Sequence, residues 1–410
     1  MSRLAASASV STGGPASVSR WWRSATARTR ARVLTWLTTA ALVCGVLISG
    51  PLWRTDRGYP RMPAFGIWSP PAPFDLFWVA LFLGVAGWLA VRGPGRAAVA
   101  ILIALAAWWC AADQSRLQPW FWQYVWMLTI LSLRSPDDEA SARRALGACA
   151  LIVAGTYFWS GWQKFNGGFV YDTFPWLTAP FTGGRPTTGP KLAAVGWLAG
   201  PVEACGGLAL LIPRCRPVAV AILVGMHAFI LACVGPWGHA WNYVVWPWNF
   251  FMVAAMALLF LARPDVLPRL LPPTRLDWAS ARLVVFAWWL LPAASLVGWW
   301  DAYLSSALYS GASLKGSLEI RDPVLDRLPE PCRRAARALR PGWHRVPIQE
   351  WSMAALRASA YPARRVLTRV GQAAADQADA AGDVTLVIDE RPEWRTGDRL
   401  QTRIELTPQK

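Results

Sequence analysis

Three ionisable side chains lie within or at the end of long apolar stretches, where they could do chemistry. Lys164 stands near the end of an aromatic run, YFWSGWQKFNGGF, at residues 157–169. Glu203 lies in the stretch PVEACGGLALLIP, and His227 lies in the apolar run that follows it. Charged groups inside a bilayer are costly, and they usually face a cavity or a partner. We therefore take these three residues as the candidate catalytic set.

Glu203 and His227 are expected at one depth in adjacent helices. Glu203 precedes Pro213 by ten residues, and His227 follows Arg216 by eleven. A helical rise of about 1.5 Å per residue then places both roughly 15 Å from the same turn. An acid and an imidazole at matched depth suit a proton route. The alternative is that each makes a structural interhelical hydrogen bond, worth about 1 kcal/mol.

Lys164 is expected at the opposite end of its helix, near the outer interface. It follows Arg144 by twenty residues, which corresponds to about 30 Å of helix. A desolvated lysine can lose its proton and act as a base, whereas arginine stays protonated. We therefore predict that Lys164 is a general base. The alternative is snorkelling, in which the amine reaches the headgroups.

Aromatic and polar residues predicted at the same level as Lys164 would bind a cofactor. Trp159 and Trp162 would form the walls of this pocket, and the polar members come from several separate segments. The expected binding set is Trp159, Trp162, Gln163, Asp113, Arg116, His239 and Asn242. No metal site is expected, because the seven cysteines include no CxxC pair and five of them lie in apolar runs.

The composition predicts an all-α polytopic membrane helix bundle with a small α/β C-terminal segment outside the cytoplasm. Of 410 residues, 54% are hydrophobic and 16% are charged, whereas about a quarter is charged in soluble proteins. Windows without charge indicate about nine spans. They are expected at 33–50, 74–91, 97–112, 119–133, 145–163, 192–212, 217–236, 245–262 and 283–300.

The chain divides into three predicted parts. Residues 1–32 resemble a disordered basic cytoplasmic arm, and residues 33–300 form the transmembrane domain. Residues 301–410 have the composition of a water-soluble segment. That segment contains strand-like runs at 317–320, 384–388 and 403–406, and helical patterns at 327–338, 349–357 and 362–378.

Arginine placement predicts the orientation. The predicted cytoplasmic loops hold more arginines than the opposite loops, so the positive-inside rule places the N-terminus in the cytoplasm and the C-terminus outside. We expect a multi-pass protein of the cell inner (plasma) membrane, in contact with the lipid bilayer. The net charge of +17 comes without a basic and aromatic platform, so no nucleic-acid partner is expected.

The residues around Lys164 and the two spans that follow resemble the HTTM/DoxX-like superfamily. This superfamily includes the vitamin K-dependent γ-carboxylases and membrane subunits of quinone-linked oxidoreductases. The resemblance covers roughly residues 33–310, and it implies that Lys164 is the base that deprotonates a quinol. Two features differ from the carboxylases. No histidine precedes His227, and the exterior segment is short.

Two hypotheses follow from the sequence. In the first, an outer-face pocket binds a quinone or quinol, with Lys164 as general base in redox or carboxylase-like chemistry and with Glu203 and His227 as a proton route. In the second, the protein is a non-catalytic membrane scaffold or accessory subunit, and its C-terminal segment binds a protein partner at the extracytoplasmic face.

Overall fold

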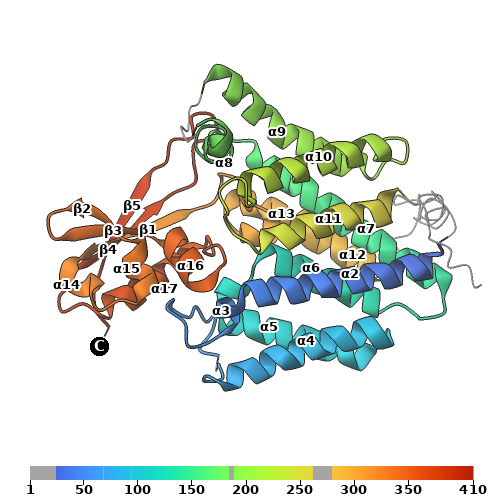
Figure 1. Cartoon of the computed structure of the whole chain (residues 1–410), viewed down its shortest axis with the longest axis horizontal. Coiled ribbons are helices and arrows are strands. Elements are labelled where there is room, and N and C mark those ends of the chain that lie inside the picture. Colours follow the sequence, from blue (N-terminus) through green and yellow to red (C-terminus); the bar gives the residue numbers. More distant parts are fainter. Residues whose placement is uncertain (1–24, 68, 94, 184–188, 262–278, 410) are drawn as a thin grey trace, which may run out of the picture.

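The protein consists of a helical bundle with a small sheet domain packed against one end of it (Figure 1). The computed structural model describes residues 25–409 except 68, 94, 184–188 and 262–278. Most of the expected arm, 1–24, lies outside the described residues. Within the described part, the helical bundle comes first along the chain and the sheet domain follows it.

Within the described part of the chain, eight long helices build most of the bundle. They are α2 (Ala27–Ile48), α4 (Phe74–Arg92), α5 (Arg96–Ala112), α6 (Pro119–Ser132), α7 (Glu139–Lys164), α9 (Pro190–Ala209), α10 (Arg216–Val234) and α11 (Val245–Phe260). Short helical pieces connect them, including α3 (Gly50–Trp53), η1 (Gln114–Arg116), η2 (Phe169–Thr173), α8 (Phe174–Thr178) and η3 (Ala179–Phe181). Each long helix coincides with an apolar run that predicted a span.

The first helix begins earlier than the sequence indicated. It starts at Ala27, so the predicted disordered arm was wrong for the residues from 27 to 32. Thr26 caps the helix by accepting a hydrogen bond from the Thr29 amide. Glu139 accepts a second bond, of 2.6 Å, from the Ala27 amide. Contacts made through the fold thus extend the helix into a segment of low apolar content.

Among the residues that the structure describes, five helices are long and apolar enough to cross a membrane, and these are α2, α4, α7, α9 and α10. The apolar helices at Arg96–Ala112, Val245–Phe260 and Ala281–Val297 are shorter, and α6 has 14 residues. The predicted count of nine spans is therefore not established. The last of them is broken into α12 (Ala279–Val285), the π-turn η4 (Phe286–Leu290), α13 (Leu291–Ala294) and the 3-10 turn η5 (Ser295–Val297). Pro292 lacks the amide proton that a regular helix would use there.

Helix α7 runs through the middle of the bundle and contacts α2, α6, α9 and α11. Its closest approach is to α9, where glycines face each other. A Cβ added at Gly200 would lie 2.8 Å from the Gly161 carbonyl oxygen, and one at Gly207 would lie 2.6 Å from the Phe158 amide. The backbones of α7 and α9 can approach this closely because Gly161, Gly200 and Gly207 carry no side chain.

The C-terminal domain holds a five-stranded antiparallel sheet in the order β2-β3-β1-β4-β5. The strands are β1 (Lys315–Arg321), β2 (Arg337–Arg340), β3 (Trp343–Pro347), β4 (Val384–Asp389) and β5 (Gln401–Leu406). The helices are α14 (Asp322–Leu325), α15 (Glu330–Ala335), α16 (Ile348–Leu356) and α17 (Arg364–Ala375). In the register, Leu318 pairs with Val346 on one side and Leu386 on the other, and all three are buried.

The three strand-like runs of the sequence are strands, and two further strands were missed. All four residues of β2 are exposed, so no alternation of buried and exposed residues marks it. The predicted helix at 327–338 is helical only in α15, and its last residues belong to β2. On β1, the buried carboxylate of Glu319 accepts hydrogen bonds from Arg345, at 2.8 Å, and from Arg403.

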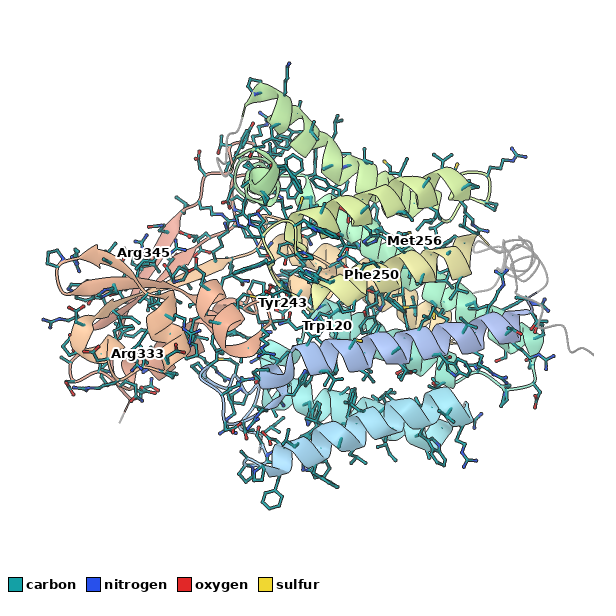
Figure 2. All side chains as sticks on the ribbon, in the orientation of Figure 1. Trp120, Tyr243, Phe250, Met256, Arg333 and Arg345 are labelled. Atoms are coloured by element: carbon teal, nitrogen blue, oxygen red, sulfur yellow. The ribbon has the colours of Figure 1, made fainter. Side chains whose placement is uncertain are left out.

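The sheet domain is held on the bundle by specific hydrogen bonds. The Trp351 indole donates to the Gly58 carbonyl at 2.7 Å, and the Gln118 amide donates to the Ser359 carbonyl at 2.9 Å. The bundle residues Trp120 and Tyr243 lie near the end that faces the domain, whereas Arg333 and Arg345 lie within the domain (Figure 2).

Candidate functional site

The candidate site is a small buried cavity in the bundle, which we call the inner chamber. Its volume is about 80 Å³. Side chains from α7, α8, α9, α10 and α11 line it, together with the loop at 306–309. The lining residues are Thr156, Tyr157, Ser160, Lys164, Leu177, Glu203, Met226, His227, Ile230, Val245, Trp248, Asn249, Met252, Ser306, Leu308 and Tyr309. All three predicted catalytic residues are therefore at one place.

Lys164 forms a buried ion pair with Glu203. The distance from Lys164 Nζ to Glu203 Oε2 is 2.7 Å, and the two side chains are 10% and 5% exposed. The ammonium also donates to Ser160 Oγ at 2.6 Å and contacts the Ser160 carbonyl oxygen at 3.4 Å. Its three protons thus have three acceptors. The amine does not reach toward headgroups, which excludes the snorkelling alternative in this structure.

A second polar chain crosses the same chamber. The Asn249 amide nitrogen donates to the Val245 carbonyl at 2.8 Å, which leaves Asn249 Oδ1 to accept from His227 Nδ1 at 2.6 Å. His227 Nε2 is then the acceptor for the Tyr157 hydroxyl, also at 2.6 Å. This order of donors assigns the Nδ1–H tautomer to a neutral His227.

The expected depths of these residues need correction. Lys164 was placed about 15 Å outside Glu203 and His227, yet it contacts Glu203 directly and shares a cavity with His227. Counting from each turn assumes parallel helices whose ends lie level, and the contact excludes that arrangement. No hydrogen bond joins Glu203 to His227 among the described residues, although both line the inner chamber.

A larger cavity, the vestibule, adjoins the inner chamber at the junction of bundle and sheet domain. Its volume is about 700 Å³, and its walls include Trp176, His239, Lys315 and Gln349. Leu308 and Tyr309 line both cavities and therefore stand between them. Burial raises the pKa of Tyr309, which keeps the phenol neutral.

The loop that separates the two cavities has unusual backbone geometry. Ser306 and Tyr309 adopt φ values of 59° and 56°, and Asn242 in the facing loop adopts 50°. Residues other than glycine enter this left-handed region at a cost, and they do so mostly where the surrounding structure fixes them. The Asn242 amide donates to the Tyr309 hydroxyl at 2.9 Å, so the two loops hold each other.

The predicted aromatic walls lie outside the inner chamber. Trp159 is buried elsewhere, and its indole nitrogen has no partner among the described residues. Trp162 is half exposed and stacks on Phe158. Gln163 donates to Ser295 Oγ at 2.7 Å. None of these three side chains lines the inner chamber or the vestibule, so a cofactor contact for them stays a prediction.

Asp113 and Arg116 belong to a structural cluster at the end of α5. Asp113 forms a buried ion pair with Arg57 and lies 3.9 Å from Arg116. Arg116 donates to the Leu52 and Trp53 carbonyls at 3.2 Å each. Burial lowers the pKa of Arg116 to about 10. Neither residue lines the chamber or the vestibule, so their predicted cofactor contact stays a prediction.

His239 lies in the vestibule, and Asn242 lies beside it. His239 stacks on Trp176 with ring centres 4.4 Å apart and donates to the Trp176 carbonyl at 2.6 Å. Asn242 also donates to Ser359 Oγ at 3.2 Å, across the junction with the sheet domain. Of the predicted binding set, His239 is the member that lines a cavity next to the chamber.

Sequence reasoning missed Tyr157, Ser160 and Tyr309. Tyr157, Ser160 and Lys164 follow one another at helical spacing and so share one face of α7. That stripe was a readable signal. Tyr309 carried none, because its position depends on contacts between distant loops, such as its hydrogen bond with Asn242.

The described residues contain no group of three or more His, Cys, Asp or Glu side chains that could hold a metal ion. No family model, curated protein or solved structure matches the chain. The resemblance to the HTTM/DoxX-like superfamily thus stays a prediction.

Proposed function

We propose that this is a multi-pass inner-membrane protein of the HTTM/DoxX-like kind that binds a quinone-like ring and exchanges a proton with it. Its N-terminus would lie in the cytoplasm and its sheet domain outside. The observation that carries the proposal is the inner chamber, where an ion pair and a Tyr–His–Asn chain meet beside the vestibule. Intramembrane ionisable groups that face a cavity commonly mark a site of function.

Membrane insertion is supported by the outer surface of the bundle. On α4, Phe77 is 62% exposed and Val91 is 80% exposed, and only 22% of that helix's apolar window is buried inside the protein. In water, a long apolar helix exposed to this extent would be unfavourable, whereas in a bilayer it faces lipid.

The two cavity volumes support a position for the proposed ring in the vestibule. An engineered cavity of about 150 Å³ in another protein binds benzene, and the inner chamber offers about 80 Å³. The chamber thus suits a few water molecules. The vestibule, at about 700 Å³, falls in the range of ligand pockets. The vestibule also contains the stacked rings of Trp176 and His239, which are flat aromatic surfaces of the kind that a quinone-like ring packs against.

Within this proposal, Glu203 accepts the proton and Lys164 supplies the positive charge. Glu203 Oε2 holds Lys164, and Oε1 has no hydrogen-bond partner among the described residues. The quinol O–H bond would break, and its proton would pass through the chamber to the carboxylate. The resulting quinolate would stay in the vestibule. The Lys164 ammonium, no longer paired with a charged Glu203, would stabilise it by charge attraction across Leu308 and Tyr309. A general-base role for Lys164 would first require loss of a proton that three acceptors hold.

The test is anaerobic binding of a short-chain naphthoquinol to the purified full-length protein, followed by the absorbance of the quinolate anion. We expect the anion spectrum in the wild type at a pH where free quinol is neutral. Glu203→Gln should bind the quinol without the anion spectrum. Glu330→Gln, which alters an exposed acid of the sheet domain, is the matched control and should behave as the wild type.

Lys164→Arg separates the two roles of the lysine. Arginine keeps the charge but cannot act as a base, so it should retain the anion spectrum if Lys164 is a counter-charge. Loss of the spectrum in Lys164→Arg would favour the general base. Absence of quinol binding by the wild type, or an unchanged spectrum in Glu203→Gln, would refute the proposal.

The scaffold hypothesis predicts a silent Lys164→Ala. Hydrogen bonds hold the sheet domain against the bundle, and residues of the sheet domain form part of the vestibule wall. These contacts favour a site shared by the two parts over a sheet domain that serves only to bind a protein partner.

A further inference from the structure

A third cavity, which shares no lining residue with the inner chamber, lies along α5 and α6. We call it the lateral groove. Its volume is about 720 Å³, and its walls include Ile103, Ala107, Cys110, Phe121, Trp122 and Val125. None of its lining residues lines the inner chamber or the vestibule. It is therefore a separate site with its own chemistry.

The lateral groove is apolar along its length and basic at one end. Ile103 and Ala111 both line it on α5, and Phe121 and Thr129 both line it on α6. Each pair is eight residues apart, which corresponds to about 12 Å of helix. Gln114 and two arginines of α17, Arg365 and Arg369, also line it. Gln114 follows the end of α5, so the basic end lies where the helices leave the apolar region.

The two arginines differ in how their charges are used. Arg365 donates to Asp301 Oδ1 at 2.8 Å and to Gln114 Oε1 at 2.6 Å, and its charge is balanced by Asp301. Arg369 lies one helical turn further along the same face of α17 and is exposed. Among the described residues, it has no hydrogen-bond or ion-pair partner, and no acidic side chain lines the groove.

We propose that the lateral groove binds an anionic phospholipid of the surrounding bilayer. One acyl chain would lie between α5 and α6, and the phosphate would bind Arg369. The length of about 12 Å fits one leaflet, which is roughly half of a hydrocarbon core of about 30 Å. A guanidinium suits a phosphate because it presents planar paired donors. This inference rests on the membrane insertion proposed above, and not on the ring or its proton.

Lipid binding to purified, delipidated full-length protein tests the inference. Native mass spectrometry would compare phosphatidylglycerol with phosphatidylcholine of the same chains. We expect the wild type to prefer the anionic lipid by about fivefold, as one uncompensated arginine near a phosphate provides. Arg369→Gln should remove this preference. Arg340→Gln, which alters an exposed arginine of β2, is the matched control and should keep it.

A second pair of variants tests the acyl-chain part of the site. Ala107→Trp would fill the lateral groove and should weaken binding of both lipids about tenfold, because several methylene groups lose their burial. Ala104→Trp places the same ring on an exposed position of α5 outside the groove, and it should leave binding unchanged. Glycerol phosphate, which has the headgroup chemistry without the chain, should not compete.

Equal binding of the two lipids by the wild type would overturn the inference, as would an unchanged preference in Arg369→Gln. So would wild-type binding by Ala107→Trp. These results would leave the quinolate experiment unaffected, so the two proposals fail separately. The Arg369 variant lies on the surface of α17, so its outcome stands even if the larger Ala107 substitution prevents folding.

Discussion

Removing one partner of the Lys164–Glu203 pair is the most direct test of the inner chamber. In Glu203→Leu, the Lys164 ammonium would keep only Ser160 as an acceptor. Both side chains are at most 10% exposed, so water screens the remaining charge poorly. Breaking a buried pair in this way costs about 3–5 kcal/mol. For a chain of this length, that corresponds to a fall in Tm of about 5 °C.

The double variant Lys164→Met, Glu203→Leu is the informative control. Replacing both charges with apolar groups removes the desolvation cost as well as the attraction, and such replacements are often neutral or stabilising. We therefore expect its Tm to return to within about 2 °C of the wild type. The assay is thermal unfolding in detergent, followed by tryptophan fluorescence at a fixed scan rate. If the fall in Tm of the double variant equalled the sum of the falls in the two single variants, the inference that Lys164 and Glu203 form a buried ion pair would be refuted.

Three further predictions concern other parts of the fold. Gly161→Ala should destabilise the bundle by about 1–3 kcal/mol, because the added Cβ would press on the α9 backbone. Gly225→Ala on α10 is the control and should not destabilise the bundle, because its Cβ would meet open space. Thermal unfolding of the two variants measures the difference. Burial alone would raise the pKa of Glu319, but hydrogen bonds from two arginines outweigh it and lower the pKa. Its stabilisation is thus present above about pH 4.3 and lost on acidification, so denaturant titrations of Glu319→Gln should show a weaker loss of stability in acid than the wild type. Cys215, exposed between α9 and α10, should react with an impermeant maleimide only after the membrane is permeabilised; labelling of intact cells would contradict the orientation.

The sequence by itself determined where most helices lie and which residues deserved attention. Uncharged runs and their Gly or Pro ends are local properties, so the apolar helices appear close to their expected positions. Lys164, Glu203 and His227 stood out because a charge is costly in an apolar run. Local signals failed for the early start of α2 and for β2. There, a capping contact from Glu139 and pairing with a neighbouring strand determine the conformation.

Only the tertiary structure decided which side chains meet. Helix rotation and the relative shift of neighbouring helices are set by packing, and depth counted along the chain contains neither. Lys164 therefore bonds Glu203, while its sequence neighbours Trp162 and Gln163 face elsewhere. The vestibule and the lateral groove both need residues of the C-terminal domain beside the bundle. Contacts between segments that are hundreds of residues apart leave no periodic trace in sequence, because periodicity records only which face of an element is apolar.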